Sequence, residues 1–141
     1  MIQEGIYATL AADSGVSAIV AARIYPLMIP QTSYTETTKF PCIVYSIDSK
    51  SRQVRFDGTD TLVSASLSVE CYATTYSQAQ SLAAAVRSVL VDFSGVMTGG
   101  GSPQSQTPVQ SIFVESEDDT LAAEPGVYIV MQDYTVWYDE A

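Results

Sequence analysis

The chain contains no histidine, and this absence removes several kinds of chemistry at once. Ser-His-Asp and Cys-His catalytic groups and histidine-containing metal sites are excluded, because each of them needs an imidazole. The glycine-rich stretch at 99–102 lacks the lysine and the spacing of a phosphate-binding loop, so it predicts flexibility and no nucleotide site. An enzyme is therefore a disfavoured interpretation, and no cofactor is expected.

Cysteine is also scarce. The two cysteines, Cys42 and Cys71, each fall inside a predicted strand. We predict that both are small, reduced core residues, because free cysteine is often buried and disulfides are disfavoured in a reducing compartment. A cysteine nucleophile would need a nearby base or a helix N-terminus, and neither cysteine has an obvious one in the sequence around it.

Basic residues and long hydrophobic runs are the other shortages. The chain has 6 Lys and Arg residues and 16 Asp and Glu residues, which gives a net charge of −10. This charge argues against tight nucleic-acid binding, which needs clustered cations. No apolar run approaches the ~20 residues of a membrane span. The N-terminal residues carry no positive charge before the first apolar ones, so no signal peptide is predicted. We expect a protein of the cytosol that does not enter a membrane.

Hydrophobic residues make up 47% of the 141 residues, which predicts one domain over residues 1–141 with a single core. The clearest pattern runs from 61 to 93. Its first half alternates and predicts a strand, whose apolar face comprises Val63, Ala65, Leu67, Val69 and Cys71. Its second half predicts a helix that Thr75 caps and Gly95 ends. The apolar face of that helix comprises Tyr76, Ala79, Ala83, Val86, Leu90 and Phe93.

The remaining patterns complete the predicted fold. A helix is expected over 2–12, followed by a short helix that Ser14 or Ser17 caps. An extended segment that begins at Ile24 and is bracketed by Pro26 and Pro30 is expected to be coil or an edge strand, and 31–39 a polar loop. Further strands are expected at 42–48, 109–115 and 127–138. The order predicts an α+β fold, with an antiparallel or mixed β-sheet and helices packed on one face.

Half of the basic residues lie in one segment, 49–60, between two predicted strands. They are Lys50, Arg52 and Arg55. Asp57-Gly58 is a turn signal, so the segment predicts a long hairpin with a projecting tip. Its charges belong either to a solvated loop or to a contact with acidic surface on a neighbouring copy. Residues 94–108 are rich in Gly and Ser and predict a flexible loop.

The predicted turn between the last two strands is strongly acidic: it carries Glu115, Glu117, Asp118, Asp119 and Glu124. Consecutive acids are usually a solvated turn, and they lack the spacing of a calcium loop, so no metal is expected. At a net charge of −10, identical copies repel unless positive charge lies at their contact. The residues predicted for a subunit interface are therefore Lys50, Arg52, Arg55, Asp57, Glu115, Glu117, Asp118 and Asp119.

Three stretches carry a family resemblance: RIYP at 23–26, VECYATTYSQA at 69–79 and YTVWY at 134–138. Together with the overall order of elements, they resemble the tail-completion proteins of long-tailed bacteriophages. These are also called tail terminator or tail-to-head joining proteins. The resemblance covers nearly the whole chain, although the loop containing GGGSPQSQ does not align.

The resemblance implies a structural virion protein with an α+β fold that forms a ring, usually a hexamer. Such a ring caps the finished tail tube, stops its polymerisation and joins the tail to the head connector. The implied partners are further copies of the chain, the major tail tube protein and the head–tail connector or stopper protein. DNA passes through the lumen without specific binding. The implied location is the head-proximal end of the virion tail, assembled in the host cytoplasm.

Two other interpretations stay open. A connector or stopper subunit, or a tube-like subunit, would be a different virion part built on the same fold. A small acidic hydrolase is a third possibility from another class, which the missing histidine disfavours.

Overall fold

The structure, a computed structural model, describes residues 2–20, 23–26, 41–55, 58–91, 93–98, 106–121 and 127–139. The loop predicted at 31–39 lies outside these residues. The helices within them are α1 (Ile2–Ala12), α2 (Ser14–Val20) and α4 (Tyr76–Leu90). The strands are β1 (Ile24–Pro26), β2 (Cys42–Arg55), β3 (Gly58–Ala73), β4 (Gly95–Thr98), β5 (Gln106–Leu121) and β6 (Tyr128–Asp139).

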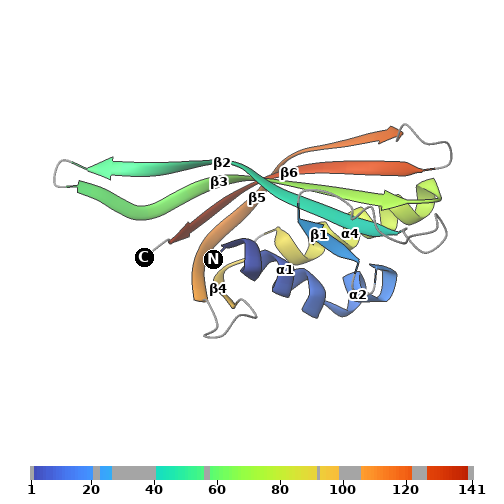
Figure 1. Cartoon of the computed structure of the whole chain (residues 1–141), viewed down its shortest axis with the longest axis horizontal. Coiled ribbons are helices and arrows are strands. Elements are labelled where there is room, and N and C mark those ends of the chain that lie inside the picture. The colour runs from blue at the N-terminus through green and yellow to red at the C-terminus, as the bar shows by residue number, and fades with distance from the viewer. Residues whose placement is uncertain are drawn as a thin grey trace.

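The described strands form one six-stranded sheet in the order β1-β2-β3-β6-β5-β4. Strand β1 pairs with β2 in parallel, and the other neighbouring strands pair antiparallel. Figure 1 shows α1 and α2 gathered on one side of the sheet, and the β2–β3 hairpin reaching well past the helices at the left. The α+β prediction is confirmed, and of its two alternatives the mixed sheet is the one that the chain adopts.

Strand β3 leads directly into α4, as the change of period predicts. The alternating side chains from Val63 to Cys71 are at most 2% exposed. The backbone N–H of Gln78 donates to the Thr75 hydroxyl oxygen at 3.2 Å, which confirms Thr75 as the N-cap. The helix therefore begins where the sequence sets it, and its first turn is anchored to the end of the strand.

The other end of α4 differs from the prediction. The helix ends at Leu90, and Val91 follows it in extended conformation. Gly95 does adopt the left-handed region, with φ 129°, but it opens β4 and does not cap the helix. Ala79, Ala83, Val86 and Leu90 are confirmed on the buried face of the helix. Phe93 lies beyond the end of the helix, although it packs against the core. Tyr76 is 53% exposed, and its hydroxyl reaches the surface residue Asp119.

One hydrophobic core fills the space between the helices and one face of the sheet. Helix α4 contributes its buried side chains, which are Ala79, Leu82, Ala83, Val86 and Leu90. Helix α1 adds Ile2, Ile6 and Leu10. Glycine at position 5 allows α1 to approach β4, because a Cβ there would lie 2.7 Å from the Cβ of Met97. The opposite face of the sheet carries no described helix.

Helix α2 lies where it is predicted, but a different residue caps it. The Asp13 carboxylate accepts a hydrogen bond from the backbone N–H of Val16 at 3.0 Å. Asp13 is therefore the cap, and the prediction of Ser14 or Ser17 is wrong. Aspartate and serine serve this position about equally well, so the sequence alone does not distinguish them. Strand β1 confirms the edge-strand alternative for Ile24–Pro26.

Both cysteines are fully buried and free, which confirms the prediction. Cys71 packs in the main core beneath the helices, whereas Cys42 packs with Val127 in a second cluster. In the β2–β3 register, Cys71 opposes Ile43, the residue next to Cys42. Successive strand residues point to opposite faces, so the sheet backbone separates the two thiols.

Two predicted loops are partly strand. Strand β4 and the first residues of β5 lie inside 94–108, while residues 99–105 lie outside the description. The acidic residues 115–119 lie within β5 and not in a turn, since β5 pairs with β6 as far as Leu121. Aspartate and glutamate are depleted in strands, so composition favoured a turn, but cross-strand pairing outweighs that preference.

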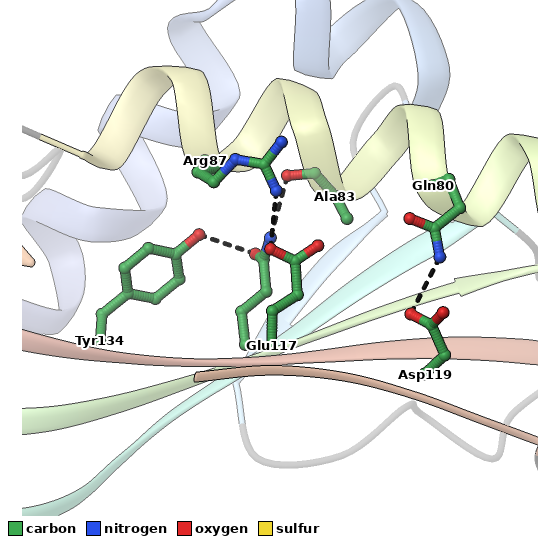
Figure 2. A network of polar contacts seen from close by, with 7 residues as sticks. Gln80, Ala83, Arg87, Glu117, Asp119 and Tyr134 are labelled. Atoms are coloured by element: carbon green, nitrogen blue, oxygen red, sulfur yellow. Dashed lines mark hydrogen bonds and ion pairs between the residues drawn. The ribbon is translucent and has the colours of Figure 1, made fainter. Parts of the chain in front are cut away.

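A polar network connects α4 to the sheet through the apolar core (Figure 2). Gln132, fully buried on β6, donates from Nε2 to the carbonyl oxygen of Ala83 on α4 at 3.0 Å. Its Oε1 accepts the hydroxyl proton of Tyr134 at 2.8 Å. Burial raises the pKa of Tyr134, so the hydroxyl stays protonated and continues to donate.

Replacing Leu67 with Ala tests the assignment of strand faces. Leu67 is 0% exposed in the core, so Leu67→Ala should lower the free energy of unfolding by ~2–5 kcal/mol in urea denaturation. Ser66→Ala, one residue away on the opposite face, is the matched control and should stay within ~0.5 kcal/mol of wild type. Wild-type stability of Leu67→Ala would contradict the assignment.

A double-mutant cycle tests the buried network. Gln132→Leu removes the acceptor of the Tyr134 hydroxyl and should cost ~1–3 kcal/mol of unfolding free energy, because a buried donor loses its partner. Adding Tyr134→Phe removes that hydroxyl too. The double variant should therefore cost less than the sum of the two single variants. Additive costs would show that the two side chains do not interact.

Candidate assembly surfaces

Strand β2 presents a long edge of the sheet. Strand β1 pairs only with Ile43–Tyr45. Beyond that point, within the described part of the chain, residues 46–55 have no strand on their outer side. Backbone N–H and C=O groups on such an edge are available to another strand.

The basic residues of the predicted interface lie on this edge. Lys50 and Arg52 are exposed, and in register they oppose Ala65 and Val63, whose side chains are buried toward the helices. Both cations therefore lie on the helix side of the hairpin. Two further predicted residues cannot be placed in the same way: Arg55 ends β2 with its side chain outside the description, and Asp57 is outside it altogether.

Strand β5 presents the edge on the other side of the sheet. Its partner β4 pairs only with residues 106–109 of β5. Among the described residues, 110–121 have no strand on their outer side. All four acidic residues of the predicted interface lie on this stretch: Glu115, Glu117, Asp118 and Asp119.

Two of these acids face helix α4. The Arg87 guanidinium lies 2.6 Å from Glu117, and the Asp119 carboxylate accepts from the Tyr76 hydroxyl at 2.7 Å and from Gln80 Nε2 at 2.9 Å. These two hydrogen bonds hold the pKa of Asp119 below its usual value, so it remains ionised. Figure 2 shows both carboxylates reaching from the sheet toward α4.

The other two acids lie on the opposite, open face of the sheet. Glu115 accepts from the Thr135 hydroxyl at 2.9 Å. Asp118 opposes Met131, and both side chains are exposed. A register shift between Val114 and Ser116 leaves Glu115 without a directly opposed residue on β6, so the regular alternation of side chains between the two faces is interrupted there.

Among the described residues, Lys50 and Arg52 lie on a different edge of the sheet from the four acids. Strands β3 and β6 lie between β2 and β5. At about 4.8 Å between neighbouring strands, the two edges are about 14 Å apart along the sheet. The structure thus brings the four acids together on one edge and places the cations on the other.

A second polar cluster, on the open face, was not predicted. The Ser68 hydroxyl lies against the carboxylates of Asp48 and Asp133, at 3.0 Å from Oδ1 of Asp133. Ser116 donates to Oδ2 of Asp133 at 3.0 Å, and Ser46 donates to Asp48 at 3.1 Å. The alternating serines of β3 signalled a polar face, but the partners come from strands distant in sequence.

An open hollow of about 530 Å³ lies at the N-terminal end of α4 and is lined by Tyr76, Asp119, Thr120 and Tyr128. The rings of Tyr76 and Tyr128 meet edge to face, with centroids 6.0 Å apart. The Asp119 carboxylate already accepts two hydrogen bonds, and the described residues that line the hollow include no nucleophile–base pair.

Within the described part of the chain, no cluster of three or more Cys, Asp or Glu side chains is placed to hold a metal ion. Burial raises the pKa of the Cys71 thiol, so it is not a ready nucleophile.

None of the described helices combines the length and the apolar character that crossing a lipid bilayer requires.

Comparisons with known proteins agree with this architecture. Among solved structures, the chain is similar to one described as "Virion of native gene transfer agent (GTA) particle". The TM-score is 0.67 at 14% identity, over 95% of this chain and 91% of that chain, which shows a shared fold. No curated protein sequence matches significantly. A family model described as "Tail completion protein gp17" matches residues 4–139. This chain therefore belongs to the tail completion protein gp17 family.

Proposed function

We propose that the protein is the tail terminator of a long-tailed bacteriophage. In this proposal its copies form a ring, usually six, that caps the tail tube, stops tube polymerisation and joins the tail to the head connector. The family match over residues 4–139 carries the proposal, because completing a tail requires a part that ends the tube. The partners are the chain itself, the major tail tube protein and the connector or stopper protein, at the head-proximal end of the tail.

The distribution of charge supports a ring. One edge of the sheet carries Lys50 and Arg52, and the opposite edge carries the acidic residues of β5. Two different, complementary surfaces on one chain favour head-to-tail contacts, which close into a ring when the rotation between copies allows it. Such contacts also reduce the repulsion between copies of net charge −10.

The open face of the sheet suits the passage of DNA. It carries Asp48 and Asp133 in the serine–aspartate cluster, together with Glu70, which accepts from the Tyr72 hydroxyl at 2.6 Å. Carboxylates repel the phosphate backbone, so DNA can pass such a surface without being held. The proposed role is structural rather than catalytic.

Charge neutralisation tests the ring and the cap together. Lys50→Gln with Arg52→Gln should weaken each subunit interface by up to about 2 kcal/mol, because exposed ion pairs contribute ~0–1 kcal/mol each. High salt should weaken the wild-type ring in the same direction. Sedimentation measures the ring, and electron microscopy of tail tubes grown with each protein measures whether growth stops. Wild type should shorten the tubes, and the variant should do so only at higher concentration.

The matched control is Ser81→Glu with Ser88→Glu, two exposed positions on α4 that change the net charge by the same amount. It should sediment and shorten tubes like wild type. Tubes of unchanged length with wild-type protein would refute the terminator function. In that case, growth of the chain into long polymers would identify a tube-like subunit, and binding to heads alone would identify a connector or stopper.

A further inference from the structure

The sheet leaves two long strand edges open, and these edges are unlike each other. Residues 46–55 of β2 have no outer partner among the described strands. Residues 110–121 of β5 have none among them either. Edges of this length usually attract other strands, and bulges and charges restrict which ones. Here the β2 edge carries cations and the β5 edge carries acids, so like edges repel and unlike edges attract.

We propose that the β5 edge of one copy pairs with the β2 edge of the next, so that one continuous antiparallel sheet runs through the ring. This inference rests on the proposed ring and specifies how its subunits join. The partner is a second copy of this chain, identified by the complementary charge of the two edges.

The strand directions support the pairing. Strands β2, β3, β6 and β5 alternate in direction, since each neighbouring pair is antiparallel. Rotation about a ring axis to which the strands are tilted, as in a closed β-barrel, keeps neighbouring strands in alternating directions and the helices on the same side. A neighbouring copy placed in this way continues the alternation, because its β2 runs antiparallel to the first copy's β5. The helices of all copies then lie on one side of the shared sheet.

The side chains suggest a register. Lys50 and Arg52 lie on the helix side of β2, and Glu117 and Asp119 lie on the helix side of β5. Each pair is two residues apart, so an antiparallel register sets Lys50 opposite Asp119 and Arg52 opposite Glu117. Lys50 is level with Ile112 across its own sheet, so this register shifts each copy by seven residues along the strands and tilts the strands relative to the ring axis. Contacts with Arg87, Tyr76 and Gln80 already hold these carboxylates in place, and each carboxylate can accept further hydrogen bonds.

Cysteine cross-linking tests the inference. The same register sets Ser51 opposite Asp118 on the open face, within reach of a disulfide between directly opposed strand residues. Ser51→Cys protein mixed with Asp118→Cys protein should give covalent dimers under mild oxidation, and neither variant alone should. A chain carrying both substitutions should give a series of covalent oligomers, the largest of which contains as many copies as the ring. Ser49→Cys with Thr120→Cys tests the same register if the first pair disturbs folding.

The control mixture is Ser51→Cys with Ser88→Cys, an exposed position on α4, and it should give no dimers. The native Cys42 and Cys71 are buried and common to all variants. If rings form by sedimentation but neither cysteine pair cross-links, the edge pairing is wrong and the terminator function survives. Cross-linking of Ser51→Cys alone would indicate a symmetric contact and would also overturn the inference. Absence of any ring, even on tail tubes, would refute both proposals.

Discussion

Burial of one face of the sheet beneath α4 is the constraint on which the rest of the molecule depends. The inward side chains of β3 and β6 are almost all buried, and α4 covers them with five buried residues of its own. Since β3 runs straight into α4, the strand and its cover form one continuous unit. The hydrogen bond from Gln132 to Ala83 then fixes the helix to β6 at a single position. Apolar area supplies most of the stability of such a layer, and the buried polar contact makes its alignment specific.

This constraint separates folding from assembly. The main core lies on one face of the sheet. Among the described residues, the outer sides of 46–55 and 110–121 and much of the open face are therefore left for other contacts. The β2–β3 hairpin extends past the helices in Figure 1, where it gains no support from the core of its own chain. A long, charged extension of this kind is expensive to order for folding alone. The proposed contact with a neighbouring subunit would account for this extension.

Periodicity alone revealed the central strand and helix, the buried cysteines and the α+β class, because each depends on local alternation and burial. The sequence was less informative where long-range pairing decides the outcome. The acids at 115–119 resemble a turn, yet pairing with β6 makes them part of a strand. Gln132 and the Asp48–Ser68–Asp133 cluster join residues far apart in the chain, so no local pattern shows them. The sequence did show that basic residues gather at 49–60 and acidic residues at 115–119. Only the order of strands in the sheet shows that these two segments lie on opposite edges.

Hydrogen exchange, measured residue by residue in the monomer and in the assembled ring, distinguishes the core from the assembly surfaces. We infer that the core is complete in one chain and that assembly uses the two sheet edges. Protection should rise on assembly at the outer-facing amides of 46–55 and 110–121, while the amides of α4, β3 and β6 stay as protected as in the monomer. Protection gained instead on the helices or on the open face, with the edges still exchanging freely, would show that assembly does not use the sheet edges.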